Sequence, residues 1–131
     1  YQADCILLIL SILSDDQAIE FINYANEIKL DCIIEVHDED ELKRAIKLDY
    51  PVIGINNRNL KSLEINLNNS INLNKNLTND YILIAESGIK TSDDIKKFNS
   101  TGIYNFLIGE SLLKSKDKEK KIGELLLNES Y

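Results

Sequence analysis

Several polar residues in this sequence each follow directly on a short apolar run. They are Ser11, Glu35, Asn56 with Arg58, Glu86 with Ser87, and the segment 109–111. Short apolar runs are typical of buried strands, and parallel α/β sheets bind their ligands at the carboxyl ends of their strands. We therefore expect these side chains to share one edge of a sheet and to form a candidate site there.

Glu35 lies near the end of the apolar stretch CIIEV at residues 32–36. A carboxylate on a buried strand is costly unless it is paired or hydrogen-bonded. Desolvation would raise its pKa and suit it to acid–base catalysis. The alternative is a structural glutamate that a neighbouring Arg or Lys holds in place, and the pattern favours neither interpretation.

The run from Asn56 to Asn59 also allows two interpretations. Asparagine tolerates left-handed backbone and caps helices, so the run could be a turn after the strand. Alternatively, Asn56 and Arg58 could contact a ligand, since a guanidinium can bind a carboxylate or a phosphate through two hydrogen bonds. For Arg58, the competing interpretation is a surface ion pair with an acidic residue of a neighbouring loop.

Two glycine turns follow the last two apolar runs. Ser87-Gly88 comes after ILIAE, and Gly109-Glu110-Ser111 comes after YNFLI. Glycine lets the backbone approach an anion, and the start of a helix offers free N–H groups. A structural turn explains either one alone equally well. Together they favour a phosphorylated ligand, because barrels commonly bind phosphate after their last two strands.

The elements that would position these residues alternate along the chain. Apolar runs predict strands at 4–10, 32–36, 52–55, 81–86 and 104–109, and helical patterns cover 14–30, 38–48, 66–77, 91–100, 110–115 and 117–130. Ser14 with Gln17 forms a capping box at the start of the first helix. Five successive βα units predict a parallel sheet with helices outside it, either doubly wound or a barrel.

Composition limits the function classes. The 131 residues are 44% hydrophobic and 28% charged, as in a single globular domain, and the net charge of −7 without a basic stripe argues against nucleic-acid binding. No apolar run reaches the roughly 18–20 residues of a membrane span, and no secretory signal is visible. Cys5 and Cys32 are expected to be buried free thiols in a reducing cytoplasm. His37, the single histidine, lacks partners at metal-ligand spacing, so no metal site is expected.

The motifs ADCILLILSIL, EVHDEDEL, GINNRNL, AESGI and FLIGESLL, in this order and spacing, resemble the indole-3-glycerol-phosphate synthase family of tryptophan biosynthesis. The resemblance covers nearly the whole chain and implies a (β/α)8 TIM barrel. The five βα units resemble strands four to eight, so residues 1–131 would be a partial barrel domain. The implied activity is that of a cytoplasmic carboxy-lyase without a cofactor. It closes the ring of 1-(2-carboxyphenylamino)-1-deoxyribulose 5-phosphate and releases CO2 and water.

The resemblance also implies roles for individual residues. Glu35 matches the catalytic glutamate, a general acid–base group, while Asn56 matches an active-site asparagine and Ser87 a serine that contacts the substrate. The remaining matches are binding residues: Leu7 and Leu8 as the apolar wall around the anthranilate ring, Arg58 and Glu86 as further substrate contacts, and Gly88, Gly109 and Glu110 as phosphate-binding turns that act through backbone N–H groups.

The sequence departs from the family in its first part. The family's Glu-x-Lys pair on strand one and its general-acid lysine on strand three have no counterpart here and would precede Tyr1. We therefore expect the 131 residues alone not to turn over substrate, and unpaired strand edges to favour association. The opening YQADCILLILSIL and the closing LLLNES look closest to versions fused to phosphoribosylanthranilate isomerase, so fusion to or association with that enzyme is expected.

Two alternatives stay open beside this interpretation. One is a different phosphate-binding barrel enzyme, such as a sugar-phosphate isomerase, against which GINNRNL together with AESGI argues. The other is a non-catalytic phosphate-binding module or remnant of the enzyme. It would bind the product phosphate without turnover even with the upstream sequence restored.

Overall fold

The computed structural model describes residues 2–78 and 80–126. The five strands are β1 (Cys5–Ile9), β2 (Asp31–Val36), β3 (Val52–Asn56), β4 (Ile82–Glu86) and β5 (Asn105–Leu107). The helices are the 3-10 helix η1 (Leu10–Ile12) and the α-helices α1 (Asp15–Glu27), α2 (Glu39–Lys47), α3 (Asn68–Asn74), α4 (Ser92–Asn99), α5 (Glu110–Leu113) and α6 (Lys118–Leu126).

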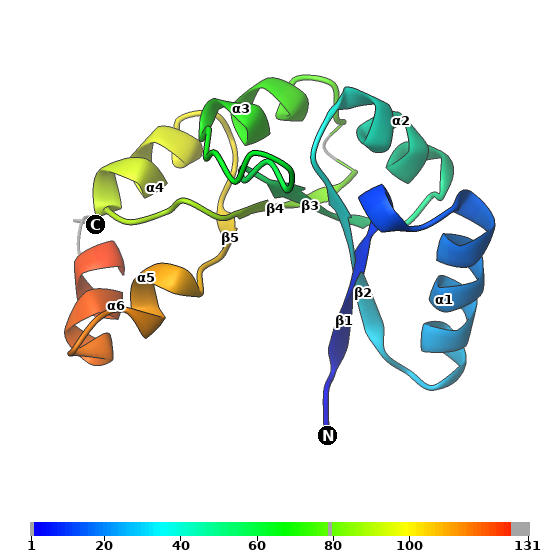
Figure 1. The fold of residues 1–131 in the computed structure, drawn as a ribbon, viewed down its shortest axis with the longest axis horizontal. Helices are drawn as coiled ribbons and strands as arrows, with labels where there is room; N and C mark the ends of the chain where they lie inside the picture. The colour runs from blue at the N-terminus through cyan, green and yellow to red at the C-terminus, as the bar shows by residue number, and fades with distance from the viewer. Residues whose placement is uncertain (1, 79, 127–131) are drawn as a thin grey trace.

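The strands form one open, parallel sheet in the order β1-β2-β3-β4-β5. Helices α1 to α4 lie in an arc along one face of the curved sheet (Figure 1). Each strand pairs with the next one along the chain, as in a barrel, whereas a doubly wound sheet reverses its strand order at a switch point. The predicted architecture, an incomplete barrel of five consecutive βα units, is therefore confirmed.

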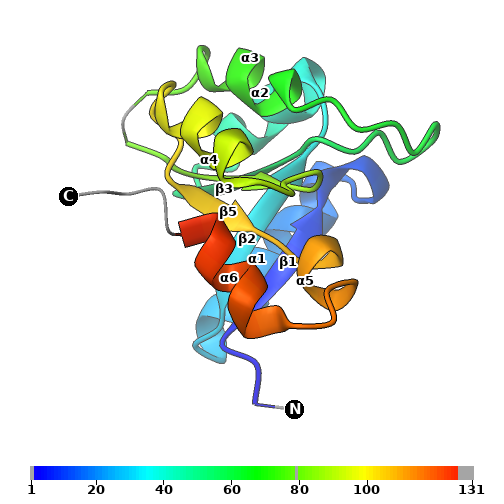
Figure 2. The same ribbon diagram turned by 90° about the vertical axis from the view of Figure 1, so that its left-hand side faces the viewer.

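Most element boundaries agree with the sequence prediction, and the exceptions have local causes. The capping boxes of α1 and α4 are present, with Ser14 bonded to Gln17 and Thr91 bonded to Asp94. Helix α3 is shorter than predicted, because its cap residue Leu67 offers no side-chain hydrogen bond and asparagine competes with helical backbone. Helix α6 packs against α4 and α5 (Figure 2), and residues 127–130 of its predicted range lie outside the described residues.

The hydrophobic core lies between the sheet and the arc of helices. Every second strand residue faces this layer, as the period of a strand requires. From the strands it contains Leu8, Cys32, Ile34, Val36, Ile53, Ile55, Leu83 and Ala85, all buried. The other face of the sheet carries Glu35, Gly54, Asn56 and Glu86. Its polar groups therefore project from the concave side, away from the helices.

Three further observations concern the composition-based expectations. Cys32 is buried as expected, but Cys5 is exposed, because it begins an edge strand that no described element covers. Both are free thiols. Among the described residues, no group of three or more His, Cys, Asp or Glu side chains could hold a metal ion. None of the helices described here is long and apolar enough to cross a membrane.

Candidate active site

The carboxyl ends of β2, β3 and β4 bring three polar side chains together. In the sheet register Glu35 lies beside Gly54, and Asn56 lies beside Glu86. These residues share one face, because side chains two positions apart on a strand point the same way. Glu35 and Glu86 are each only 3% exposed and Asn56 is 9% exposed. The fold thus places two carboxyls and an amide in a buried group on the concave face.

Gly54 determines how the two carboxyls meet. A Cβ atom at this position would lie 2.0 Å from Oε1 of Glu86 and 2.9 Å from Cγ2 of Ile33. The Glu86 carboxyl therefore occupies the space that a side chain on β3 would fill. It reaches across β3 and contacts the carboxyl of Glu35 on β2. A larger residue at position 54 would separate the two acids.

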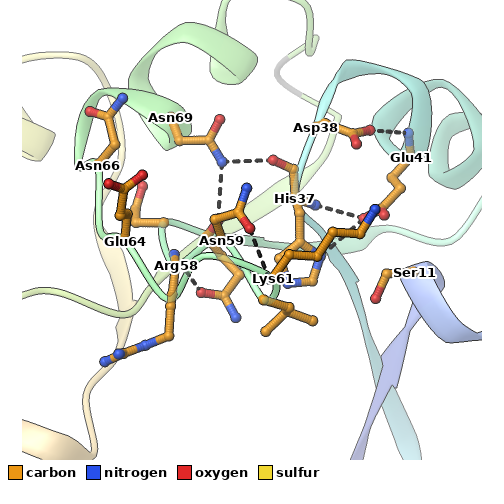
Figure 3. Close-up of a pocket in the computed structure, with 13 residues that line it drawn as sticks. Ser11, His37, Asp38, Glu41, Arg58, Asn59, Lys61, Glu64, Asn66 and Asn69 are labelled. Carbon is orange, nitrogen blue, oxygen red and sulfur yellow. Dashed lines mark hydrogen bonds and ion pairs between the residues drawn. The ribbon is translucent and has the colours of Figure 1, made fainter.

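His37 lies against Glu35 on the outer side of this pair. Its Nε2 is 3.1 Å from Oε1 of Glu35, an ion-pair contact without the alignment of a hydrogen bond. Its Nδ1 is 3.0 Å from Oε2 of Glu41, which also accepts the backbone N–H of His37 at 2.8 Å. Figure 3 shows the ring directed toward Glu41 of α2. The imidazole is thus held between two carboxylates.

From the sequence, His37 was expected only to lack a metal site, and its contacts with Glu35 and Glu41 were not predicted. The signal was present in EVHDEDE, because His37 directly follows β2, two residues after Glu35, and extended backbone would place both side chains on one face. Glu41 lies four residues after His37, in the first turn of α2. A carboxylate, an imidazole and a second carboxylate at these spacings are typical of a held acid–base group.

The environment separates the pKa values of these acids. Burial by itself would raise the pKa of Glu35, but the contacts with His37, Glu86 and Asn56 outweigh burial and lower it. Glu86 lacks such donors: burial, and then the neighbouring Glu35 carboxylate, raise its pKa to about 8. The contact with Glu35 raises the pKa of His37, against the opposite effect of burial, and Glu41 adds to the increase.

The second asparagine of GINNRNL has a structural role larger than the expected turn. Asn57 is buried, and its Oδ1 accepts hydrogen bonds from the backbone N–H of Ser70 at 3.1 Å and from its hydroxyl at 2.8 Å. Its Nδ2 donates to the backbone carbonyls of Glu86 at 2.9 Å and Ser87 at 3.3 Å. Asn59 does match the turn interpretation, since its Oδ1 accepts from the backbone N–H groups of Lys61 and Ser62.

Arg58 is placed apart from the carboxyl pair. Its guanidinium forms an ion pair with Glu110, and it points away from His37 (Figure 3). Glu110 also pairs with Lys114. This geometry matches the surface ion pair that the sequence left open for Arg58. Glu110 thus pairs with both Arg58 and Lys114 at the turn that was expected to bind phosphate.

The two glycine turns meet at a small cavity of about 190 Å³ beside this ion pair. It is lined by Arg58, Ser87, Gly88, Ile89, Leu107, Ile108, Gly109, Glu110 and Ser111. The hydroxyl of Ser111 is buried there without a hydrogen-bond partner among the described residues. Ser111, which the sequence placed in the segment 109–111 without a role of its own, is thus a polar group of this cavity.

Ser87 and Gly88 both have left-handed backbone, with φ of 65° and 85°. For Ser87 this conformation is uncommon and typical of a constrained functional position. At Gly88 a Cβ would lie 2.4 Å from Cγ2 of Ile65, so the loop packed on this turn also requires glycine. Gly109 shows no such restriction, because a Cβ there would meet no atom within 4 Å.

A second, larger cleft of about 460 Å³ also has Arg58 in its wall (Figure 3). Its walls come from the ends of β2 and β3, from the loop after β3, from α2 and α3, and from Ser11. The lining residues are Ser11, His37, Asp38, Glu41, Asn56, Asn57, Arg58, Asn59, Leu60, Lys61, Glu64, Asn66 and Asn69. Most are polar, so this cleft suits a polar ligand that reaches Asn56 and His37.

The two leucines expected to form one apolar wall lie on opposite faces of β1. Leu8 is 6% exposed and belongs to the core under the helices. Leu7 is 40% exposed and lies on the concave side, beside Ile33 in the register. Successive strand residues point to opposite faces, so only Leu7 faces the same side as Glu35. The expectation for Leu8 is corrected accordingly.

Comparison with known proteins places the chain among relatives of one kind. A family model described as indole-3-glycerol phosphate synthase matches residues 1–125. An indole-3-glycerol phosphate synthase of Acinetobacter baumannii is 50% identical over 113 residues, 86% of this chain and 42% of the relative. The enzymes of that name from Legionella pneumophila and Delftia acidovorans are 45% and 40% identical, covering 95% and 94% of this chain but 48% and 46% of their own lengths. The chain thus spans about half the length of these curated relatives.

Solved structures with little sequence similarity share the fold. The Amycolatopsis orientalis BexX/CysO complex contains a chain that superposes with a TM-score of 0.66 at 9% identity, covering 93% of this chain and 52% of that one. A mandelate oxidase bound to (S)-2-phenylpropionate gives 0.67 at 10% identity, covering 96% and 47%. At such low identity these similarities concern the arrangement of strands and helices alone.

Proposed function

This chain belongs to the indole-3-glycerol phosphate synthase family, and we propose that it provides the strand-four to strand-eight part of such an enzyme, with residues 1–131 as one partial barrel domain. The family membership confirms the resemblance drawn from the motifs. The proposed reaction closes and decarboxylates 1-(2-carboxyphenylamino)-1-deoxyribulose 5-phosphate, a carboxy-lyase reaction of tryptophan biosynthesis. The substrate is a small phosphorylated molecule, and the reaction uses no cofactor.

One observation carries the proposal more than any other. The family match covers residues 1–125 and so includes Glu35, Asn56 and Ser87, the three residues proposed to have catalytic roles. All three lie at the carboxyl ends of successive parallel strands, where barrel enzymes place their chemistry. A phosphate-binding module without catalysis would have no need of a buried carboxyl pair beside Asn56.

The chemistry of the reaction gives Glu35 its role. Departure of water requires a proton on the leaving hydroxyl, and formation of the aromatic ring requires removal of a proton. A buried carboxylate can carry out such transfers if its ionisation is controlled by its neighbours. Glu35 has these neighbours in His37 and Asn56. We assign Glu35 as the acid–base residue and Asn56 as the amide that orients it or the substrate.

The phosphate end of the substrate is assigned to the cavity between the two glycine turns. Gly88 and Gly109 line this cavity, the backbone of Gly109 is open because a Cβ there would meet no atom within 4 Å, and the buried hydroxyl of Ser111 is available to donate a hydrogen bond. Arg58 lies at the same cavity and supplies positive charge. The larger cleft beside His37 and Asn56 is then assigned to the remainder of the substrate.

Two broader assignments belong to the same proposal. We place the protein in the cytoplasm, where a biosynthetic enzyme with two free thiols would function. We also propose that it is fused to or associates with phosphoribosylanthranilate isomerase, on the similarity of its ends to fused versions.

A chimeric enzyme tests the proposed function. In the Legionella pneumophila relative, the segment that aligns with this chain, 48% of that protein, is replaced by the corresponding residues of this chain. We expect the chimera to form indole-3-glycerol phosphate from the carboxyphenylamino substrate, measured by indole fluorescence. Glu35→Gln in the chimera should lower the rate by about 10²–10⁴, the usual range for one acid–base group.

Glu39→Gln is the matched control, because Glu39 is an exposed glutamate of the same α2 region whose partner is Lys43. It should leave the rate unchanged. A folded chimera that binds the product phosphate without turnover would contradict the proposal and favour the non-catalytic module.

A further inference from the structure

We infer that Glu35 and Glu86 hold a single acidic proton between them across Gly54, that Glu86 carries this proton at neutral pH, and that His37 and Glu41 keep Glu35 in its anionic form. The inference rests on the proposed function for its catalytic use only. The protonation states themselves are properties of this chain, whatever reaction the protein catalyses.

The first step is the contact between the two acids. Both side chains are almost fully buried, and they come from β2 and β4, which are separated by β3. They reach each other only because Gly54 has no side chain. Two carboxyls in contact at a buried site cannot both be ionised, since each charge destabilises the other. One of them must therefore hold a proton at neutral pH.

The contacts of the two acids decide which of them holds the proton. Glu35 contacts His37 and Asn56, which stabilise a negative charge. Oε1 of Glu86 has no hydrogen-bond partner among the described residues. A buried anion without a donor is far more costly than a neutral carboxyl. The asymmetry makes Glu86 the neutral member, and burial together with the Glu35 carboxylate raises the pKa of Glu86 to about 8.

The charge balance around His37 also favours a neutral Glu86. The charged groups that act on this site come from β2, α2 and β4, namely Glu35, His37, Glu41 and Glu86. An imidazolium between the carboxylates of Glu35 and Glu41 leaves the group with one net negative charge. Ionising Glu86 as well would bring the net charge of this buried group to −2. Glu41 thus acts as a positioning residue, because it orients the imidazole that faces Glu35.

In the proposed reaction this arrangement supplies an acceptor and a donor at once. In the loss of water, Glu86 gives its proton to the departing hydroxyl, and Glu35 takes up the proton that the new ring loses as it becomes aromatic. The proton on Glu35 then passes to Glu86 through their contact, which restores the starting state. Both carboxyls thus end the step in their starting protonation states, because the proton taken from the ring replaces the one that leaves with the water.

The test is a carbon-13 NMR titration of the folded chain with its glutamate carboxyl carbons labelled. We expect the signal that disappears in Glu86→Gln to titrate near pH 8 in the wild type, and the signal that disappears in Glu35→Gln to titrate below the ordinary range. The wild type alone already tests the inference. A spectrum in which no glutamate titrates above pH 6 overturns it, as does one in which Glu35 is the acid that titrates near 8.

The pKa of His37 provides a second measurement, and its NMR signals need no assignment because the chain has a single histidine. Glu35→Gln and Glu41→Gln should each lower the measured pKa of His37, because each removes a neighbouring carboxylate. Glu39→Gln, the control in the same helix turn, should not. Glu86→Gln should have little effect below pH 8, since it replaces one neutral group by another. A large fall in the His37 pKa with Glu86→Gln would overturn the inference.

These titrations need no turnover, so the two proposals can fail separately. An inactive chimera together with a Glu86 that titrates near 8 would refute the proposed function and leave the shared proton standing. An active chimera in which Glu86 titrates as an ordinary glutamate would do the reverse.

Discussion

Gly54→Ala is the sharpest test of the packing that joins the two carboxyls. The added methyl group would lie 2.0 Å from Oε1 of Glu86 and 2.9 Å from Cγ2 of Ile33. Both distances are too short, so the Glu86 carboxyl must move away from Glu35. The end of a glutamate side chain can rotate, but here it is 3% exposed and has little room. We expect the cost of an overpacked core, about 1–3 kcal/mol of unfolding free energy.

The measurement is urea unfolding at pH 6, in the wild type and in a Glu86→Ala background. Without the Glu86 carboxyl, the closer of the two contacts is gone. Alanine also restricts the unfolded chain more than glycine does, which stabilises the folded state by about 0.4–1 kcal/mol. In that background the substitution should therefore cost less than about 1 kcal/mol. The coupling between the two positions should reach about 0.5–3 kcal/mol, as for residues in contact.

Gly109→Ala is the matched control for this cycle. A Cβ at Gly109 would meet no atom within 4 Å, and the φ of −113° suits any residue. Its effect should stay within about 0.5 kcal/mol. If Gly54→Ala costs the same with and without the Glu86 carboxyl, then that carboxyl does not occupy the space above Gly54. The account of the shared proton would lose its geometric basis.

Three further predictions can be tested by unfolding and by ligand-binding measurements. The folded chain keeps a proton on Glu86 that the unfolded chain loses, so its unfolding free energy should fall as pH rises from about 4.5 to about 8. Glu86→Gln should flatten this dependence, and an unchanged slope would contradict it. Glu110→Gln should strengthen binding of inorganic phosphate, measured by calorimetry, because it frees Arg58 and removes a negative charge; equal or weaker binding would argue against phosphate at this cavity. Asn57→Ala should cost about 1–3 kcal/mol for each buried group left unpaired, whereas Asn59→Ala, in an exposed turn, should cost less.

The fold was predictable because its signals are local. Apolar runs alternate with capped helical segments, and successive βα units leave few topologies open. The pattern could not choose between a barrel and a doubly wound sheet; the strand order decides this, and it is a property of the whole chain. The expectation that Leu8 lines the site was wrong for a related reason. A continuous apolar run does not show which residues face the helices.

The site was predictable only in part. Sequence placed Glu35, Asn56 and Glu86 at strand ends, and the fold brings them to one face. The contact between Glu35 and Glu86 could not be read from the sequence, because it joins strands that are not neighbours. It depends on the absence of a side chain at Gly54, a residue that reads as an ordinary strand glycine.

Asparagine side chains tie the ends of neighbouring strands together. Parallel strands leave backbone carbonyls unpaired where they stop, and buried carbonyls need partners. Nδ2 of Asn69 donates to the carbonyls of His37 at 2.9 Å and Asn56 at 3.0 Å, which ties the end of β2 to the end of β3. Asn57 ties β3 to β4 in the same way, through the carbonyl of Glu86.

These two amides hold the backbone of the residues that carry the acid–base groups, and neither contacts a carboxyl oxygen in any hydrogen bond described here. Short amide side chains suit this task because each offers both a donor pair and an acceptor without adding charge. A charged residue in either place would act on the proton shared by Glu35 and Glu86. Asn69→Ala, which removes both donated hydrogen bonds without adding a charge, should therefore lower the unfolding free energy by about 1–3 kcal/mol and leave the titration of Glu35 unchanged. A shift in the Glu35 titration with unchanged unfolding free energy would show that Asn69 acts on the acid directly.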